Sequence, residues 1–313
     1  MKQEPLVSIL MNCYNGACYL REAIDSVMGQ TYRKWELIFW DNQSTDNSAS
    51  ICRSYDDSRI RYFRALNHTN LGAARALALQ QAKGEFIAVL DTDDLWLPRK
   101  LELQVPMFVC PEVGIVIADT IFFDGSGQER QLYKLSPPPQ GYVFRELITR
   151  YFVSLETVIL RKRAVDSLNQ SFDPALSHIS DMDLIVRLSR DWKLSYVPQV
   201  LAKWRVHADS GSWQEPERFM LEKRQFARKM DSLYPRDDSD WQQAKNAFLR
   251  DIAISGATAS LIKGDKAECR KNLSSFTLDS WKTIVLYLIS FVPVLVSAAL
   301  IKAYRRTRSI NAK

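Results

Sequence analysis

The sequence of 313 residues lacks the cysteine spacing of a disulfide framework or a structural zinc site. Its five cysteines are scattered along the chain and odd in number. The first residues, MKQEPLVSILM, form a segment that is too short and too acidic for a signal peptide. Both features predict a protein of the reducing cytosol.

The motifs of several nucleotide-binding and nucleic-acid-binding classes are also missing. The chain has neither the glycine–lysine pattern of a P-loop nor the glycine pattern of a dinucleotide site. It has no zinc-finger or RNA-binding motif, and its basic stretches are not interleaved with aromatic residues. Although the formal charge is +6, we therefore predict no nucleic-acid partner.

Apolar runs and helical patterns alternate along the N-terminal third of the chain. The runs LVSILM, WELIFW and EFIAVL predict three buried strands, and segments 16–31 and 70–84 predict helices between them. A strand–helix–strand order gives right-handed crossovers, so the pattern predicts a mostly parallel sheet with helices on both faces. The predicted fold class is α/β.

The remainder of the chain has a less regular pattern. An amphipathic helix is predicted at 179–191, with Ser180 as its N-cap. Further apolar runs predict strands at 114–123, 154–162 and 194–207. Beyond about residue 213 the pattern becomes helical and polar. The expected organisation is a catalytic domain over 1–212, a C-terminal helical extension over 213–280 and an apolar, basic-flanked segment over 281–313.

Polar side chains follow each of the first three predicted strands. These residues are Asn12 and Asn15, then Asp41 and Asn42, then Asp91, Asp93 and Asp94. Ligands of such sheets bind beyond the carboxyl ends of the strands. One polar strand end is typical of an ordinary turn, whereas three that converge favour a binding site.

The third strand end, AVLDTDDLW, concentrates negative charge. Two carboxylates about 4 Å apart repel by roughly 4 kcal/mol at an effective dielectric constant near 20. Hard oxygen ligands suit Mg²⁺ or Mn²⁺, which would cancel this repulsion and bind substrate phosphates. The twelve-residue pattern of an EF-hand is missing, and adjacent acids on a turn cannot be separated like the carboxylates of a glycosidase.

At this point the chain resembles the inverting family-two glycosyltransferases with a GT-A fold. The matching blocks are segments 7–48 and 70–102, SDMDLIVRL and WRVHADSGS, in the order of the family. Together they span residues 6 to about 212, which is two thirds of the chain. The resemblance implies a GT-A, Rossmann-like sheet and a nucleotide-sugar donor.

The resemblance also implies a donor site. Asp91-Thr92-Asp93 matches the D-x-D motif, in which Asp93 would bind Mn²⁺ or Mg²⁺ and Asp91 would contact the ribose or the metal's coordination sphere. Asp94 would be a structural cap. The remaining donor-binding residues that the resemblance implies are Asn12, Tyr14, Asn15, Asp41, Asn42 and Arg75. Asn42 is a departure, because the family usually has an aspartate there that meets the base.

The catalytic base that the resemblance implies is Asp181, near the start of a helix whose N-terminus favours an ionised carboxylate. Arg205 and His207 match a loop that closes over the donor. Arg205 would offset phosphate charge, and His207 would bind the metal or the diphosphate. Glu156 and Thr157 are expected to face the acceptor.

An uncharged apolar stretch of the length of a membrane span occupies residues 283–301. Pro293 would kink a helix at its middle, and a basic tail follows it. Because nucleotide sugars and basic tails are both cytosolic, we expect peripheral or re-entrant attachment to the inner face of the plasma membrane. A true crossing and a helix packed on the protein remain alternatives.

The function that the resemblance implies is metal-dependent, inverting transfer of a sugar, from a UDP-sugar, to a hydroxyl acceptor. The expected setting is polysaccharide, lipopolysaccharide or lipid-linked glycan biosynthesis. A nucleotidyltransferase is the first alternative, although its glycine-rich basic loop is absent. A catalytically inactive protein that binds nucleotide sugars is the second.

Overall fold

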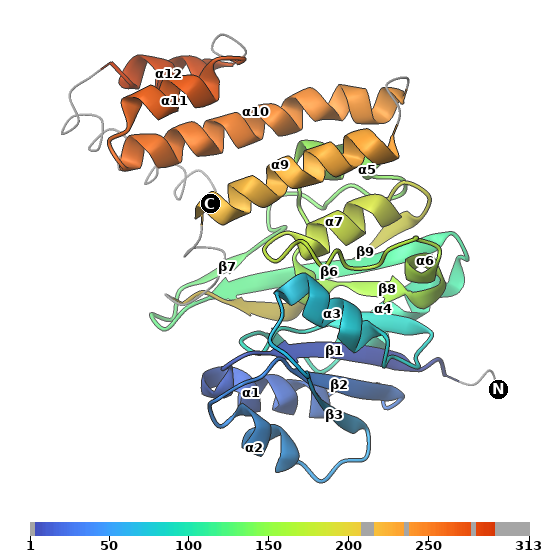
Figure 1. Ribbon diagram of the computed structural model, residues 1–313. Helices are drawn as coiled ribbons and strands as arrows, with labels where there is room; N and C mark the ends of the chain where they lie inside the picture. Colours follow the sequence, from blue (N-terminus) through green and yellow to red (C-terminus); the bar gives the residue numbers. More distant parts are fainter. Residues whose placement is uncertain (1–3, 208–215, 235–237, 277–279, 292–313) are drawn as a thin grey trace. The chain divides into compact units, whose positions relative to one another are not determined.

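The computed structural model describes residues 4–207, 216–234, 238–276 and 280–291. The chain divides into two compact units (Figure 1). The first comprises residues 1–147 and 151–210, and the second comprises residues 148–150 and 211–313.

The described part of the first unit is built on one mixed sheet. Its strands lie in the order β3-β2-β1-β4-β8-β6-β9-β5, and β7 pairs with β6. Their bounds are β1 (Val7–Cys13), β2 (Trp35–Asp41), β3 (Ile60–Arg64), β4 (Phe86–Val89), β5 (Leu95–Trp96), β6 (Val113–Phe123), β7 (Glu129–Gln131), β8 (Ile159–Arg161) and β9 (Lys193–Arg205).

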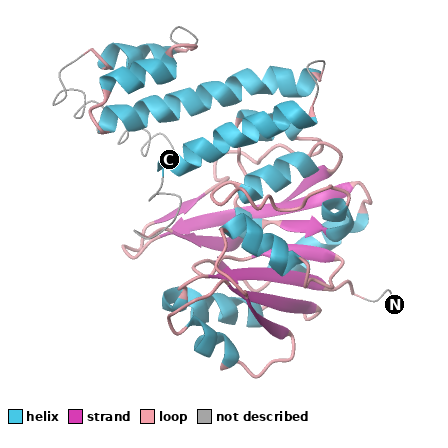
Figure 2. Cartoon of the chain, in the orientation of Figure 1, coloured by secondary structure: helices cyan, strands magenta, loops and turns pink. Residues whose placement is uncertain are grey.

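Strands β1 to β4 form the parallel half of the sheet. Every residue of β1, β2 and β4 is buried, as expected where helices cover both faces of a parallel sheet. Strand β8 joins this half to the other half through antiparallel pairing with β4 and β6. The predicted α/β fold is confirmed, and Figure 2 shows the strands as a central layer with helices on both sides.

The short helices of this part of the chain connect the strands. They are α1 (Ala17–Met28), α2 (Ser48–Arg53), α3 (Leu71–Leu79), α4 (Lys100–Gln104), α5 (Phe144–Thr149), α6 (Lys162–Asp166) and α7 (Ser180–Leu188), with 3-10 turns η1 (Val105–Val109) and η2 (Leu155–Thr157). The apolar stripe of α1 packs on alternate residues of β1, including Ile9 and Met11. Side chains alternate along a strand, so Asn12 points to the opposite face of the sheet.

One local prediction needs correction, and one strand was missed. Ser180 is the first residue of α7 rather than its N-cap, which is Ile179. The hydroxyl of Ser180 instead donates to the carbonyl oxygen of Ser177 at 3.4 Å. The edge strand β3 (Ile60–Arg64) was not predicted, because its partly exposed IRYFR sequence lacks an apolar run.

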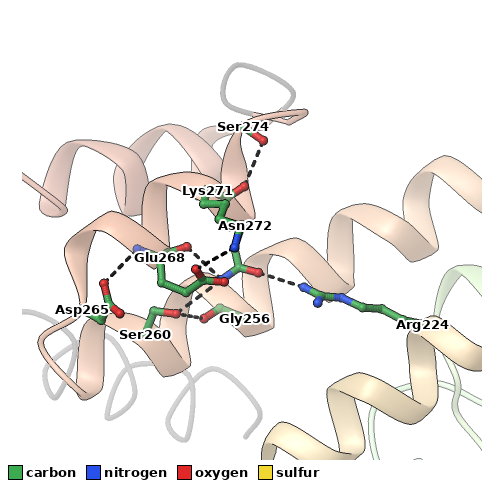
Figure 3. A network of polar contacts seen from close by, with 8 residues as sticks. All are labelled: Arg224, Gly256, Ser260, Asp265, Glu268, Lys271, Asn272 and Ser274. Atoms are coloured by element: carbon green, nitrogen blue, oxygen red, sulfur yellow. Dashed lines mark hydrogen bonds and ion pairs between the residues drawn. The ribbon is translucent and has the colours of Figure 1, made fainter.

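The described part of the second unit contains four helices, α9 (Pro216–Leu233), α10 (Ser239–Ile262), α11 (Lys266–Leu273) and α12 (Trp281–Ile289). Figure 3 shows how one amide links three of them. Asn272 of α11 accepts a hydrogen bond from Arg224 of α9 at 3.0 Å, and its side-chain nitrogen lies 3.4 Å from the Ser260 hydroxyl oxygen of α10. A Cβ at Gly256 would lie 2.8 Å from the Asn272 side-chain oxygen, so a larger residue there would require that side chain to shift.

Helix α12 covers the first part of the apolar segment that was expected over 283–301. It begins with a capping box formed by Ser280 and Thr283. Thr283 and Leu286 are buried, and Leu286 packs with Ala257 of α10 and Leu273 of α11. Residues 283–289 are therefore a helix with one face packed on the protein. Pro293 and the other residues of 292–301 lie outside the described residues. Among the helices of the described residues, none is both long and apolar enough to cross a membrane.

Candidate active site

The loops that follow β1 and β2 are joined by hydrogen bonds. Asn15 has a left-handed backbone, with φ of 53°, and its side-chain oxygen accepts a hydrogen bond from the Thr45 backbone at 2.8 Å. The backbone of Ala17 donates to Asp46 at 2.9 Å. Gly16 lies against the third loop, because a Cβ there would be 2.7 Å from the Thr92 hydroxyl oxygen. The three predicted strand ends therefore meet, and Thr92 lies among them.

Asp41 is fully buried at the end of β2, and each of its carboxylate oxygens has a partner. One oxygen accepts from the Ser44 backbone at 2.7 Å, and the other accepts from the Tyr62 hydroxyl at 2.6 Å. Burial, followed by this bond to Asp41, raises the pKa of Tyr62 to about 12. Asp41 thus fixes the loop at the end of β2.

The side-chain amide of Asn42 also forms hydrogen bonds within the chain. Its nitrogen donates to the Thr69 carbonyl oxygen at 2.7 Å, and its oxygen accepts from the Thr69 backbone at 3.2 Å. The same oxygen accepts from the Thr69 hydroxyl at 3.1 Å, and the nitrogen lies 3.4 Å from Nδ1 of His68, so a bound base would have to share or replace one of these contacts. Tyr14, in contrast, is 55% exposed, and its ring lies 4.2 Å from that of His68 between centroids. The sequence had indicated no role for His68.

Asn12 is buried, and within the described residues neither polar atom of its side chain has a hydrogen-bond partner. A buried polar group without a partner costs about 1–3 kcal/mol. This amide is therefore a place where a bound molecule or water would gain hydrogen bonds that the protein alone leaves unmade.

Arg75 of α3 is buried and links two of the predicted functional residues. Its guanidinium donates to both carboxylate oxygens of Asp91, at 2.9 and 3.1 Å. It also donates to the Ser180 hydroxyl at 3.1 Å, one residue before Asp181. Arg75 therefore joins the end of β4 to the start of α7.

Asp181 lies in the first turn of α7, where its carboxylate accepts a hydrogen bond from the Tyr151 hydroxyl at 3.3 Å. Burial raises the pKa of Asp181 above its usual value of 3.8, Arg75 opposes this shift, and Asp91 adds to it. A carboxylate of raised pKa is a better proton acceptor than an ordinary aspartate. The sequence does not predict a role for Tyr151, because nothing in the local sequence distinguishes this tyrosine.

Asp93 and His207 are in direct contact, with 2.9 Å between the carboxylate oxygen and the Nε2 atom. Burial, followed by the negative charge of Asp91, raises the pKa of Asp93, while His207 lowers it. In the described ranges, no cluster of three or more metal-ligating side chains is found. The two donors nevertheless fit Mn²⁺ or Mg²⁺, which take the rest of their ligands from water and substrate phosphates.

Arg205 is held by the chain itself. Its guanidinium donates to the Asp93 carbonyl oxygen at 2.9 Å and pairs with Glu22 at 2.8 Å. It also lies over the ring of Tyr19, 4.3 Å from the ring centroid. Two of its guanidinium nitrogens therefore have partners within the chain, and its expected role of offsetting phosphate charge stays a prediction. The hydrogen bond to the carbonyl oxygen also holds the backbone of Asp93.

Asp94 and Glu156 form a buried acidic pair beneath this loop. Asp94 accepts a hydrogen bond from the backbone of Arg205 at 2.9 Å, which agrees with a structural role. Burial, followed by the charge of Glu156, raises the pKa of Asp94 well above 3.8. Glu156 and Thr157 are both buried, so the expectation that they face the acceptor is not supported.

Comparison with known proteins gives matches to glycosyltransferases. The profile of the family described as Glycosyl transferase family 2 matches residues 8–168. The chain is 28% identical over 207 residues to UDP-Glc:alpha-D-GlcNAc-diphosphoundecaprenol beta-1,3-glucosyltransferase WfgD of Escherichia coli, covering 66% of this chain and 79% of that protein. It is 34% identical over 215 residues to a glycosyltransferase of Rickettsia typhi, covering 66% and 67% of the two chains.

Two solved structures have the same fold at low sequence identity. S. aureus TarS 1-349 in complex with UDP-GlcNAc has a TM-score of 0.68 at 18% identity, covering 96% of this chain and 92% of that one. The mannosyltransferase PcManGT of Pyrobaculum calidifontis, in complex with GDP-Man and Mn2+, has a TM-score of 0.62 at 18% identity, covering 96% and 87%. The chain has a GT-A fold and belongs to glycosyl transferase family 2.

Proposed function

We propose that the protein is an inverting glycosyltransferase that moves a sugar from a UDP-sugar to a hydroxyl acceptor. The observation that carries this proposal is the link made by Arg75. It joins Asp91, at the predicted donor site, to Ser180, beside the predicted base Asp181. The residues proposed to act on the donor and on the acceptor are therefore close together, as direct displacement of the diphosphate by the acceptor oxygen requires.

In the proposed reaction, Asp181 accepts the proton of the acceptor hydroxyl. The acceptor oxygen attacks the anomeric carbon as the bond from that carbon to the diphosphate breaks, so the configuration is inverted. The nucleoside diphosphate leaves with the electron pair of that bond. Tyr151 holds the Asp181 carboxylate by its hydrogen bond at 3.3 Å. The raised pKa of Asp181 makes it an effective proton acceptor at neutral pH.

Asp93 and His207 are the residues that would hold Mn²⁺ or Mg²⁺. When bound, the cation would supply positive charge for the departing diphosphate. The contact between Asp93 and His207 supports this assignment, as does the negative charge of Asp91 close to Asp93. The PcManGT complex, which contains Mn2+, gives independent support from the same fold.

The nucleoside part of the donor is proposed to lie over the ends of β1 and β2. Tyr14 offers an exposed ring there, and Asn12 offers an amide whose hydrogen bonds are unmade. Asn15, Asp41 and Asn42 shape this floor through bonds within the chain. UDP as the nucleotide is supported by the names of WfgD and the TarS complex.

The acceptor is proposed to be a glycan or lipid-linked glycan in the assembly of a polysaccharide or lipopolysaccharide. WfgD acts on a diphosphoundecaprenol-linked sugar, according to its name, which supports a lipid-linked acceptor. We accordingly propose that the protein works in the cytosol, attached to the inner face of the plasma membrane. Family membership favours glycosyl transfer over the nucleotidyltransferase alternative.

A donor screen followed by turnover tests this function. Thermal shifts would be measured with UDP-glucose, UDP-N-acetylglucosamine and GDP-mannose, each with Mn²⁺ or a chelator. We expect a UDP-sugar with Mn²⁺ to raise the melting temperature most. Asp93→Asn should remove the metal-dependent part of this shift, because it deletes a charged ligand and keeps the side-chain shape.

Asp181→Asn is the matched variant for the base. It should keep the donor-induced shift and lower donor turnover by roughly 10²–10⁴-fold, the usual contribution of one acid–base group. Equal losses of donor binding and turnover in Asp181→Asn would identify a structural residue instead. A wild-type protein that binds donor but neither transfers nor hydrolyses it would favour the inactive binding protein.

A further inference from the structure

The outer face of α12 exposes an apolar stripe. Trp281 and Leu288 are 62% and 60% exposed, and Phe291, just beyond the helix, is 62% exposed. Ile284 and Val285 lie between them and are 36% and 38% exposed. These positions recur at the spacing of one helix face. Contiguous exposed apolar groups of this kind mark a surface that binds something apolar.

The inner face of the same helix is already used. Leu286 is buried among α10 and α11, and Tyr287 and Ile289 pack against the same cluster. Arg270 of α11 donates to the carbonyl oxygen of Ser290 at 3.2 Å, which holds the C-terminal end of α12. The apolar stripe is thus presented on a helix whose orientation within the second unit is fixed from the other side.

Within the described residues, a basic side chain lies beside each end of this stripe. Lys282 lies over the ring of Trp281, and Arg270 lies 5.0 Å from the ring centroid of Phe291. The nearest acid on α11, Glu268, pairs with Lys271. From residue 281 onward the sequence has no acid and contains the basic residues Lys282, Lys302, Arg305, Arg306, Arg308 and Lys313. An apolar stripe bordered by basic residues matches the surface of an anionic lipid membrane.

We propose that α12 lies in the plane of an anionic membrane and inserts this stripe, Trp281, Ile284, Val285, Leu288 and Phe291, among the lipids. Tryptophan at the start of the stripe suits the boundary between lipid and water. The apolar sequence at 292–301 follows the stripe directly, so one lipid phase would accept both. This inference rests on the proposed function for its setting, because a lipid-linked acceptor would be met at that surface.

Vesicle flotation of the full-length chain tests the proposal. Vesicles of phosphatidylcholine with phosphatidylglycerol would be compared with vesicles of phosphatidylcholine alone. We expect the wild type to float with the anionic vesicles and Leu288→Glu to weaken partitioning by at least about tenfold, the effect of removing one buried leucine. Val109→Glu is the matched control, because Val109 is 91% exposed in the first unit, and it should partition like the wild type.

A fluorescent probe distinguishes lipid from other occupants of the stripe. An environment-sensitive dye on Leu288→Cys, in a chain in which Cys18 and Cys110 are replaced by serine, should shift to the blue only when anionic vesicles are added. The same dye on Val109→Cys should not shift. A blue shift without vesicles would show that the chain or a second copy covers the stripe, and would overturn the proposal. Unchanged flotation of Leu288→Glu would also overturn it.

Donor binding separates this inference from the proposed function. Leu288→Glu should show the same UDP-sugar thermal shift and the same donor hydrolysis as the wild type. If Leu288→Glu floats normally while UDP-sugars bind, the membrane inference fails and the proposed function stands. If no nucleotide sugar binds the wild type, the proposed function fails whatever the flotation result.

Discussion

At the scale of single residues, the candidate site depends on one side chain that donates hydrogen bonds to two partners. Arg75 is buried and serves both Asp91 and Ser180, which are far apart in the sequence. Its planar guanidinium donates from one nitrogen to Ser180 and from another to Asp91, whereas a lysine has a single nitrogen for both partners. The local geometry therefore requires arginine at this position and not merely a positive charge.

The hydrogen bond from Tyr151 to Asp181 predicts a change in pH dependence. The proposed base, Asp181, would act in its ionised form, and its pKa is raised, so turnover should fall as the pH falls through that raised pKa. Tyr151→Phe removes a donor that favours the ionised carboxylate, so the acid limb of the kcat profile should move to higher pH. Donor affinity should be unchanged. An acid limb at the wild-type position would show that Tyr151 does not act on Asp181.

Residue types in the site could be predicted from sequence, whereas their partners could not. Asp91 and Asp93 stand out because carboxylates end an apolar run, and Asp181 is indicated by the resemblance of SDMDLIVRL to the family's motif. Arg205 is different, because its partner Asp93 lies 112 positions earlier and Glu22 lies 183 positions earlier. Such contacts form only when the sheet folds, so no periodic pattern in the sequence indicates them.

At the scale of secondary-structure elements, α3 and the loop before α7 approach each other closely. The backbone of Gly72 donates to the Leu176 carbonyl oxygen at 3.0 Å, and Asn70 bonds to the Pro174 carbonyl oxygen. A Cβ at Gly72 would lie 2.2 Å from the carbonyl oxygens of both Asp173 and Leu176. This contact sets the distance between Arg75 and the base.

Gly72→Ala tests that contact. The added methyl group would force backbone atoms apart, so we expect a loss of roughly 1–3 kcal/mol in the free energy of unfolding, measured by urea denaturation. Turnover should also fall, because α3 carries Arg75. Gly125→Ala is the control, since a Cβ there meets nothing within 4 Å, and its stability should stay within about 0.5 kcal/mol of wild type. Equal stabilities of the two variants would contradict the argument.

The elements that the sequence predicted are those with a strong pattern. Strands β1, β2 and β4 are buried throughout and read as apolar runs, and the stripe of α1 matches the side chains that it buries. Strand β3 lies at the sheet edge and is partly exposed, so its alternating basic and aromatic residues gave no clear signal. Ser180 was misplaced by one position because helix ends depend on local hydrogen bonds.

At the scale of the whole molecule, α12 determines where the chain can be shortened. Leu286 and Thr283 are buried in the second unit, so a chain ending at Ser280 would expose the cluster around Ala257 and Leu273. Loss of the leucine contact alone is expected to cost about 1.5–3 kcal/mol. Truncation before Trp281 is therefore not a neutral way to remove the apolar segment.

Hydrogen exchange on two shortened chains tests this expectation. A chain ending at Phe291 should protect the amides of α11 as the full-length protein does, and a chain ending at Ser280 should exchange them faster. The amides of β1, in the core of the first unit, serve as the internal control. Equal protection of α11 in both shortened chains would show that α12 adds no stability to this unit.

The position of Arg75 also limits how the enzyme can be re-engineered. The negative charge of Asp91 contributes to the raised pKa of Asp181, and Arg75 opposes it, so a substitution aimed at the donor also changes the base. Asp91→Asn should lower the pKa of Asp181, and its effect should not add to that of an Arg75 variant in a double-mutant cycle. In the proposed mechanism, a change on the donor side and a change on the acceptor side are therefore coupled, and selection for a new specificity would have to solve both together.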